Sequence, residues 1–161
     1  MNTRIIFGLS ALMSFVGSVV FVRYYLWAYL LTMDRRNMLL QLVAPHLVFR
    51  FIGLSFLVPG VVSASLPAAF AIPAAYGDLG AGILAIIATV ALAKRASWAI
   101  ATVWVFNVWG AADLLFAVYQ GPRLGIEAGD FGAAFFIPTA IVPPLLVTHA
   151  LVFKLLLRRE R

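Results

Sequence analysis

Residues Phe70–Ala93 read FAIPAAYGDLGAGILAIIATVALA and contain a single charged residue, Asp78. An α-helix rises about 1.5 Å per residue, so a stretch of this length extends roughly 36 Å. The hydrocarbon core of a bilayer is about 30 Å thick. The stretch therefore predicts a helix that crosses a membrane.

Four further stretches have the same character: Ile5–Leu31, Leu39–Val62, Ser97–Tyr119 and Phe131–Leu156. Of the 161 residues, 64% are hydrophobic and 11% are charged, whereas soluble domains are nearer half apolar and a quarter charged. The first apolar run is too long for the core of a signal peptide and no small-x-small cleavage site follows it, so we interpret it as a span. We predict an all-α, polytopic membrane helix bundle of about five transmembrane helices, with residues 1–161 forming one membrane domain.

The charged residues between the spans predict the orientation. With five spans, one side of the membrane receives most of the basic residues, namely Arg35, Arg36, Lys94, Arg95, Lys154, Arg158, Arg159 and Arg161. The other side receives Arg4 and Arg123, and Arg4 runs against the trend. The positive-inside rule then places the N-terminus outside and the C-terminus in the cytoplasm, as in a multi-pass protein of a bacterial inner (plasma) membrane. The net charge of +6 follows no stripe along which a nucleic acid backbone would bind, so we expect no nucleic acid partner.

Four polar residues inside the predicted spans are candidates for an intramembrane network: Arg50, Asp78, Asn107 and Asp113. A charge near the bilayer centre costs about 2.5–3.5 kcal/mol on insertion scales, so such residues face protein or water. A structural interpretation is that Arg50 pairs with Asp78, Asp113 or both and so fixes how the helices meet. A functional interpretation is that these residues form a polar path for protons or a small solute.

Two histidines, His46 and His149, lie on different spans at similar depth. Facing histidines in a helix bundle can ligate heme b, whereas two ligands are too few for a closed zinc site. The alternative is that each histidine makes a hydrogen bond inside the bundle or lies near the lipid headgroups. The chain contains no cysteine, which excludes disulfides and thiolate sites, and leaves His46 and His149 as the possible heme or metal ligands.

The fifth span contains Pro143 and Pro144, which predict a kink. Proline has no N–H to donate to the carbonyl four residues earlier, here those of Thr139 and Ala140. In lipid, such carbonyls need donors from the bundle or from water.

No sequence motif of a soluble enzyme is present. We find no phosphate-binding loop, no G-x-S-x-G and no H-E-x-x-H. No nucleophile–base pair is visible, and we therefore expect a protein without enzymatic activity.

The pattern Arg50-x-x-Gly53-x-x-Phe56-x-x-x-Gly60, a proline-containing loop and then Asp78-Leu79-Gly80-Ala81-Gly82 resembles the DoxX-like group of small bacterial four-helix membrane proteins. The resemblance covers residues 50–156, and the extra first span and the double proline depart from it. Some members of that group are tied to quinone-linked oxidoreductases, so the resemblance implies a membrane subunit near redox chemistry. It assigns no catalytic residue.

From the sequence we expect a structural or accessory subunit of a membrane assembly. Small residues on the helix faces favour self-association or binding to another membrane protein. Two alternatives stay open: a small-solute or proton carrier that uses the intramembrane Arg and Asp residues, and a heme- or quinone-linked redox subunit.

Overall fold

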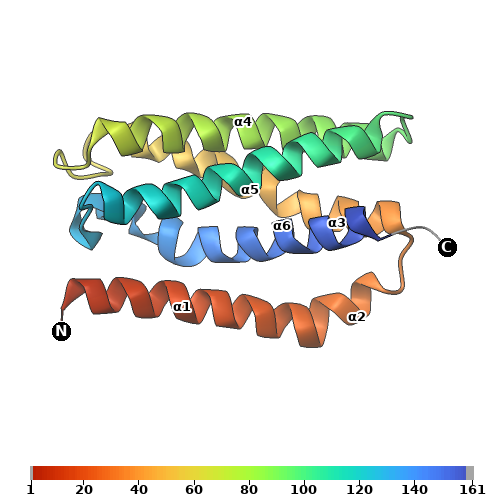
Figure 1. Cartoon of the computed structure of the whole chain (residues 1–161), viewed down its shortest axis with the longest axis horizontal. Helices are drawn as coiled ribbons and strands as arrows, with labels where there is room; N and C mark the ends of the chain where they lie inside the picture. Colours follow the sequence, from red (N-terminus) through yellow and green to blue (C-terminus); the bar gives the residue numbers. More distant parts are fainter. Residues whose placement is uncertain (1, 159–161) are drawn as a thin grey trace.

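The computed structural model describes residues 2–158, and every named element in this range is helical. Five helical segments are long and apolar enough to cross a membrane: Thr3–Leu30, Arg35–Leu57, Ala68–Ala93, Ala99–Arg123 and Ile137–Leu157. They run back and forth along one axis (Figure 1). The predicted all-α bundle is confirmed. Arg159 and Arg161 of the predicted basic tail lie outside the described residues.

Several of these segments change helix type along their length. The elements in chain order are α1 (Thr3–Phe21), the π-helix η1 (Val22–Leu26), α2 (Trp27–Leu30), α3 (Arg35–Phe49), the 3₁₀-helix η2 (Arg50–Leu57), α4 (Ala68–Ala93), α5 (Ala99–Arg123), the 3₁₀-helix η3 (Ala128–Phe135), the π-helix η4 (Ile137–Ile141) and α6 (Val142–Leu157).

The second span begins and ends earlier than the predicted Leu39–Val62. It begins at Arg35 because the side chain of Asp34 caps the helix, accepting a hydrogen bond of 2.8 Å from the backbone N–H of Asn37. It ends at Leu57 because Pro59 and Gly60 follow, and Gly60 has a φ of +83°.

The fifth segment also differs from its predicted start at Phe131. Gly132 interrupts η3 with a φ of 51°, and a Cβ at this position would collide with the carbonyl oxygen of Val61. The N–H of Ala133 donates to that same oxygen at 2.8 Å. The chain before Ile137 therefore forms part of a cap across the end of the bundle rather than the start of a straight span.

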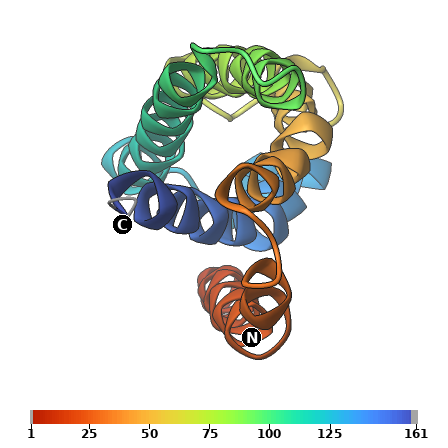
Figure 2. The same ribbon diagram turned by 90° about the vertical axis from the view of Figure 1, so that its right-hand side faces the viewer.

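Seen along the axis, α3 with η2, α4, α5 and α6 surround a common centre, and α1 lies outside this ring (Figure 2). No residue of α1 is buried. It contacts α6 and η4, and Phe7 stacks on Phe131 of η3 with ring centroids 5.6 Å apart. The molecule is thus a four-helix bundle with one helix attached to its side.

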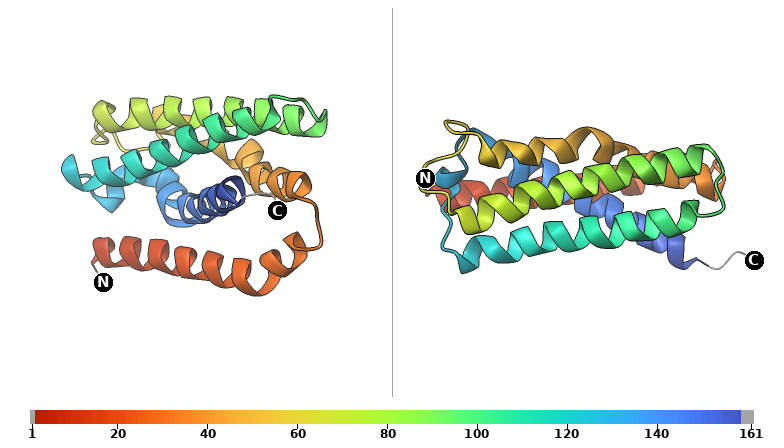
Figure 3. Two further views of the ribbon diagram at one scale, coloured as in Figure 1. Left: turned by 45° about the vertical axis from the view of Figure 1, so that its right-hand side comes forward. Right: turned by 90° about the horizontal axis from the view of Figure 1, so that it is seen from above.

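The two ends of the bundle differ in composition. We call the end that carries Arg35, Arg36, Lys94 and Arg95 the basic end, and the opposite end, with the N-terminus and residues 58–67 and 124–135, the N-terminal end (Figure 3). At the basic end, Arg36 donates to the carbonyl oxygens of Leu92 and Ala93 at 2.5 and 2.8 Å, and so caps α4. Arg36, one of the basic residues from which the orientation is predicted, therefore also stabilises the end of α4.

The N-terminal end is tied together by Asp130. Its carboxylate accepts hydrogen bonds from the Ser65 hydroxyl and from the backbone N–H of Glu127, and its carbonyl accepts from the N–H of Ser63. The Ser65 hydroxyl holds the pKa of the Asp130 carboxyl below its usual value. These contacts join the two connections that close this end.

Candidate functional site

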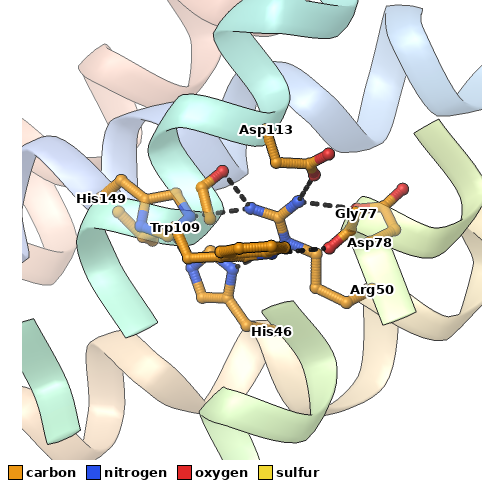
Figure 4. Close-up of polar contacts among 9 residues, drawn as sticks. His46, Arg50, Gly77, Asp78, Trp109, Asp113 and His149 are labelled. Atoms are coloured by element: carbon orange, nitrogen blue, oxygen red, sulfur yellow. Dashed lines mark hydrogen bonds and ion pairs between the residues drawn. The ribbon is translucent and has the colours of Figure 1, made fainter. Parts of the chain in front are cut away.

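The side chain of Arg50 lies at the centre of the four-helix ring and is completely buried. It occupies the point where α3 tightens into η2. Its Nη1 donates to Oδ1 of Asp78 on α4 at 2.6 Å and to Oδ2 of Asp113 on α5 at 2.8 Å (Figure 4). Arg50 therefore pairs with both aspartates, and the two ion pairs join three helices.

The other guanidinium nitrogens of Arg50 also have partners. Nη2 donates to the carbonyl oxygen of Gly110 at 2.7 Å and lies 2.8 Å from Nε2 of His149. Nε donates to Nδ1 of His46 at 3.4 Å. The cation is thus held by groups from all four helices of the ring.

The arginine contacts define the protonation of both histidines. Because Arg50 can only donate, Nε2 of His149 and Nδ1 of His46 must accept. The remaining nitrogen of each ring then carries the proton. Nδ1 of His149 donates to Oδ1 of Asn107 at 2.7 Å, and Nε2 of His46 donates to the Thr148 hydroxyl at 2.9 Å.

Asn107 and Thr148, which end these two series of hydrogen bonds, also donate to the backbone. The amide of Asn107 donates to the carbonyl oxygen of His149 at 3.2 Å, and the hydroxyl of Thr148 donates to the carbonyl oxygen of Leu145 at 2.8 Å. The six polar residues singled out in the sequence, His46, Arg50, Asp78, Asn107, Asp113 and His149, therefore belong to one cluster, which we call the Arg50 cluster.

The alternative of a heme between His46 and His149 does not fit this arrangement. The ring centroids lie 4.4 Å apart with the planes tilted by 52°, so the rings touch and leave no room for a porphyrin. All four ring nitrogens are already engaged, two of them with the Arg50 cation. Within residues 2–158 there is also no group of three or more His, Cys, Asp or Glu side chains that could hold a metal ion.

Three glycines make space for the Arg50 cluster. A Cβ on Gly53 would lie 2.7 Å from the Cβ of Asp78, and one on Gly77 would lie 2.7 Å from Cγ of Asp113. A Cβ on Gly110 would lie 2.9 Å from Nη2 of Arg50. Because none of these positions admits a side chain, the helices approach closely enough for the ion pairs to form.

The signal for one glycine was present in the sequence. In a 3₁₀-helix, residues i and i+3 lie on the same face, so Gly53 lies one turn beyond Arg50 on the same face of η2. The spacing of three residues predicts that Gly53 and Arg50 share a face. It does not predict that Gly53 contacts Asp78, which lies on another helix.

The two prolines of the fifth span mark the start of α6. Pro143 and Pro144 occupy the first turn of α6, directly after the π-helical turn of η4. The carbonyl oxygen of Ala140, which Pro144 cannot bond, faces the Ser14 hydroxyl of α1 at 3.4 Å. The irregular turn thus supplies a polar contact for the outer helix.

A cavity of about 570 Å³ extends from the N-terminal end to the Arg50 cluster. Arg4 and Glu127 line it at the N-terminal end, where they form an ion pair. Asp78 and Asp113 line it deeper in the bundle, about 15 Å along α4 and α5 from the near ends of those helices. The rest of its lining consists of apolar residues, glycines and a few prolines.

Each aspartate offers one oxygen to Arg50, and its side chain also lines the cavity. Within the described residues, Oδ2 of Asp78 and Oδ1 of Asp113 accept no hydrogen bond from protein. The side chains are nevertheless only 9% and 11% exposed. Two carboxylates face one guanidinium, so the site has one acidic group more than its own cation can balance.

Comparison with known proteins places the chain in a family without assigning a function. No curated protein and no solved structure matches it significantly. A family model does match, over residues 6–157, which include α1 as well as the four-helix ring. The chain belongs to the family described as Domain of unknown function (DUF8737).

Proposed function

We propose that this membrane protein is a carrier that moves protons, alone or in exchange for a small solute, and that Asp78 and Asp113 bind the transported species. The observation that supports this most strongly is the cavity, which reaches both carboxylates from the N-terminal end. A purely structural cluster would need no access for solvent.

The balance of charge supports the same proposal. An unpaired buried carboxylate is costly in a membrane, so the second aspartate needs either a proton or an external cation. The second aspartate would exchange a proton for an external cation. A carboxylate that does so at the end of an accessible cavity has the properties of a transport site.

The basic half of the bundle would act as the closed side of the carrier. Its core, between the Arg50 cluster and the basic end, contains tightly packed side chains with at most 1% exposure, including Leu39, Leu42, Leu92, Val103, Phe106, Val152 and Leu155. In the carrier proposal, the described conformation therefore gives access from one side.

The test is proton movement in proteoliposomes loaded with a pH-sensitive dye, under an imposed membrane potential, both without solute and with benzyltrimethylammonium inside. Wild-type protein is expected to move protons in at least one condition, and Asp113→Asn is expected to reduce the rate to that of protein-free vesicles. Asp34→Asn, which alters only a helix cap at the basic end, is the matched control. Equal rates for wild type, Asp113→Asn and protein-free vesicles in both conditions would contradict the proposal.

A second candidate function is the accessory subunit that we expected from the sequence. The observation in its favour is α1, which is long, apolar and without a buried residue. A partner helix that packs on α1 would explain its place outside the ring. Sizing after extraction in mild detergent tests this idea: a sharp monomer with no co-extracted membrane protein would argue against it.

A further inference from the structure

We propose that the cavity binds an apolar organic monocation, with its charge beside the carboxylates of Asp78 and Asp113 and its apolar body among phenylalanine rings. This inference names the class of solute for the proposed carrier and rests on that function.

The charge at the deep end of the cavity favours a single positive charge. Arg50 balances one aspartate, and its three nitrogens are fully engaged with protein acceptors. The two aspartate oxygens without protein partners belong to residues that line the cavity. A ligand with one cationic group would complete the neutralisation of the site, whereas an anion would meet two carboxylates and no free donor of Arg50.

The walls of the cavity favour an organic body over a bare ion. Phe56, Phe70 and Phe131 line it and contact one another, with ring centroids 5.6 to 6.3 Å apart. Aromatic faces attract ammonium groups and pack against apolar ones. A metal cation would instead need about six oxygen ligands, and the deep end supplies two free carboxylate oxygens.

The size of the cavity is also suitable. A volume of about 570 Å³ lies within the range of pockets that hold small organic ligands. At the N-terminal end, Arg4 and Glu127 neutralise each other, so the excess charge of the cavity lies at its deep end. A ligand would therefore orient with its cationic group inward.

The experiment is calorimetric titration of the full chain in nanodiscs of zwitterionic lipid. The probe is benzyltrimethylammonium, and phenylmethanesulfonate serves as an anion of similar shape. We expect saturable binding of one cation per chain and no binding of the anion. Asp113→Asn is expected to weaken binding about thirtyfold or more, as for the loss of one member of a buried charge contact.

A second pair of variants tests the place of binding with both carboxylates intact. Ala117 lines the cavity, and Ala112 lies on the exposed face of the same helix. Ala117→Phe is expected to abolish binding, and Ala112→Phe to leave it unchanged. If Asp113→Asn does not fold, these two variants still show whether the cation binds in the cavity.

Two results would overturn the inference: no saturable binding of the cation, or equal binding by wild type and Ala117→Phe. Tight binding of the neutral isostere neopentylbenzene with no preference for the cation would also overturn it, by assigning the cavity to neutral apolar molecules. Failure of the two proposals can be told apart. Cation binding without transport contradicts the carrier alone, and Asp113-dependent proton movement without cation binding contradicts this inference alone.

Discussion

The two halves of the four-helix ring are built differently, although the same four chain segments pass through both. In the basic half, α3, α4, α5 and α6 are regular helices whose facing residues are mostly small or aliphatic, and the core is closed. In the N-terminal half, two of the four segments change to 3₁₀ or π geometry, and the core contains phenylalanines and a cavity.

The Arg50 cluster lies where these halves meet. On its basic side, Phe106 packs against His46 with ring centroids 4.9 Å apart. On its other side, Asp78 and Asp113 face the cavity. In this bundle, regular helix packing closes one half, whereas the half with 3₁₀ and π segments contains the cavity that reaches the polar cluster.

The largest effect is expected from Arg50→Leu, which removes the cation common to both halves. Two carboxylates would stay buried without a partner, and breaking a buried ion pair in this way typically costs about 3–5 kcal/mol. We expect the variant to unfold at much lower temperature in detergent or not to accumulate in the membrane. Arg123→Leu, at an exposed position of α5, is the control. A variant as stable as wild type would show that the ion pairs do not hold the bundle together.

A comparison of two insertions would sharpen the contrast between closed and open halves. Ala85 in the basic half is completely buried, whereas Ala117 lines the cavity. Ala85→Phe is expected to destabilise the protein by about 1–3 kcal/mol or more, because it overpacks a full core. Ala117→Phe should cost much less. Thermal unfolding of both variants measures the difference, and equal losses would show that the cavity is not available space.

Gly53→Ala tests the close approach of η2 to α4. The new methyl group would lie 2.7 Å from the Cβ of Asp78, so a helix has to shift, at a cost of about 1–3 kcal/mol. Gly17→Ala on α1, where nothing lies within 4 Å, should be neutral or slightly stabilising by comparison. If Gly53→Ala and Gly17→Ala unfold in detergent at the same temperature, Gly53 does not limit how closely η2 approaches α4.

The smallest effect concerns the attachment of α1 at the N-terminal end. The hydrogen bond and charge of Arg4 hold the pKa of Glu127 below its usual value. A carboxyl with a lowered pKa in the folded protein stabilises it above the ordinary pKa, and this contribution is lost as the pH falls through the lowered value. We therefore expect the amides of α1 to be less protected at pH 3 than at pH 6, once exchange rates are corrected for their intrinsic pH dependence, and Glu127→Gln to remove most of this difference in protection. Because the side chains of Arg4 and Glu127 are exposed, their ion pair is weak and this difference should be small. An unchanged pH dependence in Glu127→Gln would assign it to other groups.

Much of the fold followed from the sequence because the bilayer limits the choices. Five apolar stretches of sufficient length predict five helices, and the cost of charge in lipid predicts that Arg50 meets aspartates. The position of α1 outside the ring did not follow, because hydropathy measures how apolar a segment is and not which surface it buries. The end of the second span at Leu57 was missed for a related reason: Val58, Val61 and Val62 extend the apolar run beyond the helix.

The candidate site was predictable in its members but not in its geometry. Spacings of four and three along the chain predict that His46 and Gly53 share a helix face with Arg50, but they do not predict that Gly53 lies against Asp78 of α4. The contacts of the histidines with Thr148 and Asn107 depend on how helices pair, which no local pattern specifies. The resemblance to DoxX-like proteins and the oligomeric or partner-bound state stay predictions.

In the carrier proposal, water reaches the aspartates from the N-terminal end and not from the basic end. Because the chain has no cysteine, single cysteines can be introduced and labelled with a membrane-impermeant maleimide in sealed vesicles. We predict that Ala117→Cys is labelled only from the side of the N-terminal end, and that Val103→Cys, in the closed core, is labelled from neither side. An unreactive Ala117→Cys, or equal labelling of both positions, would contradict this account.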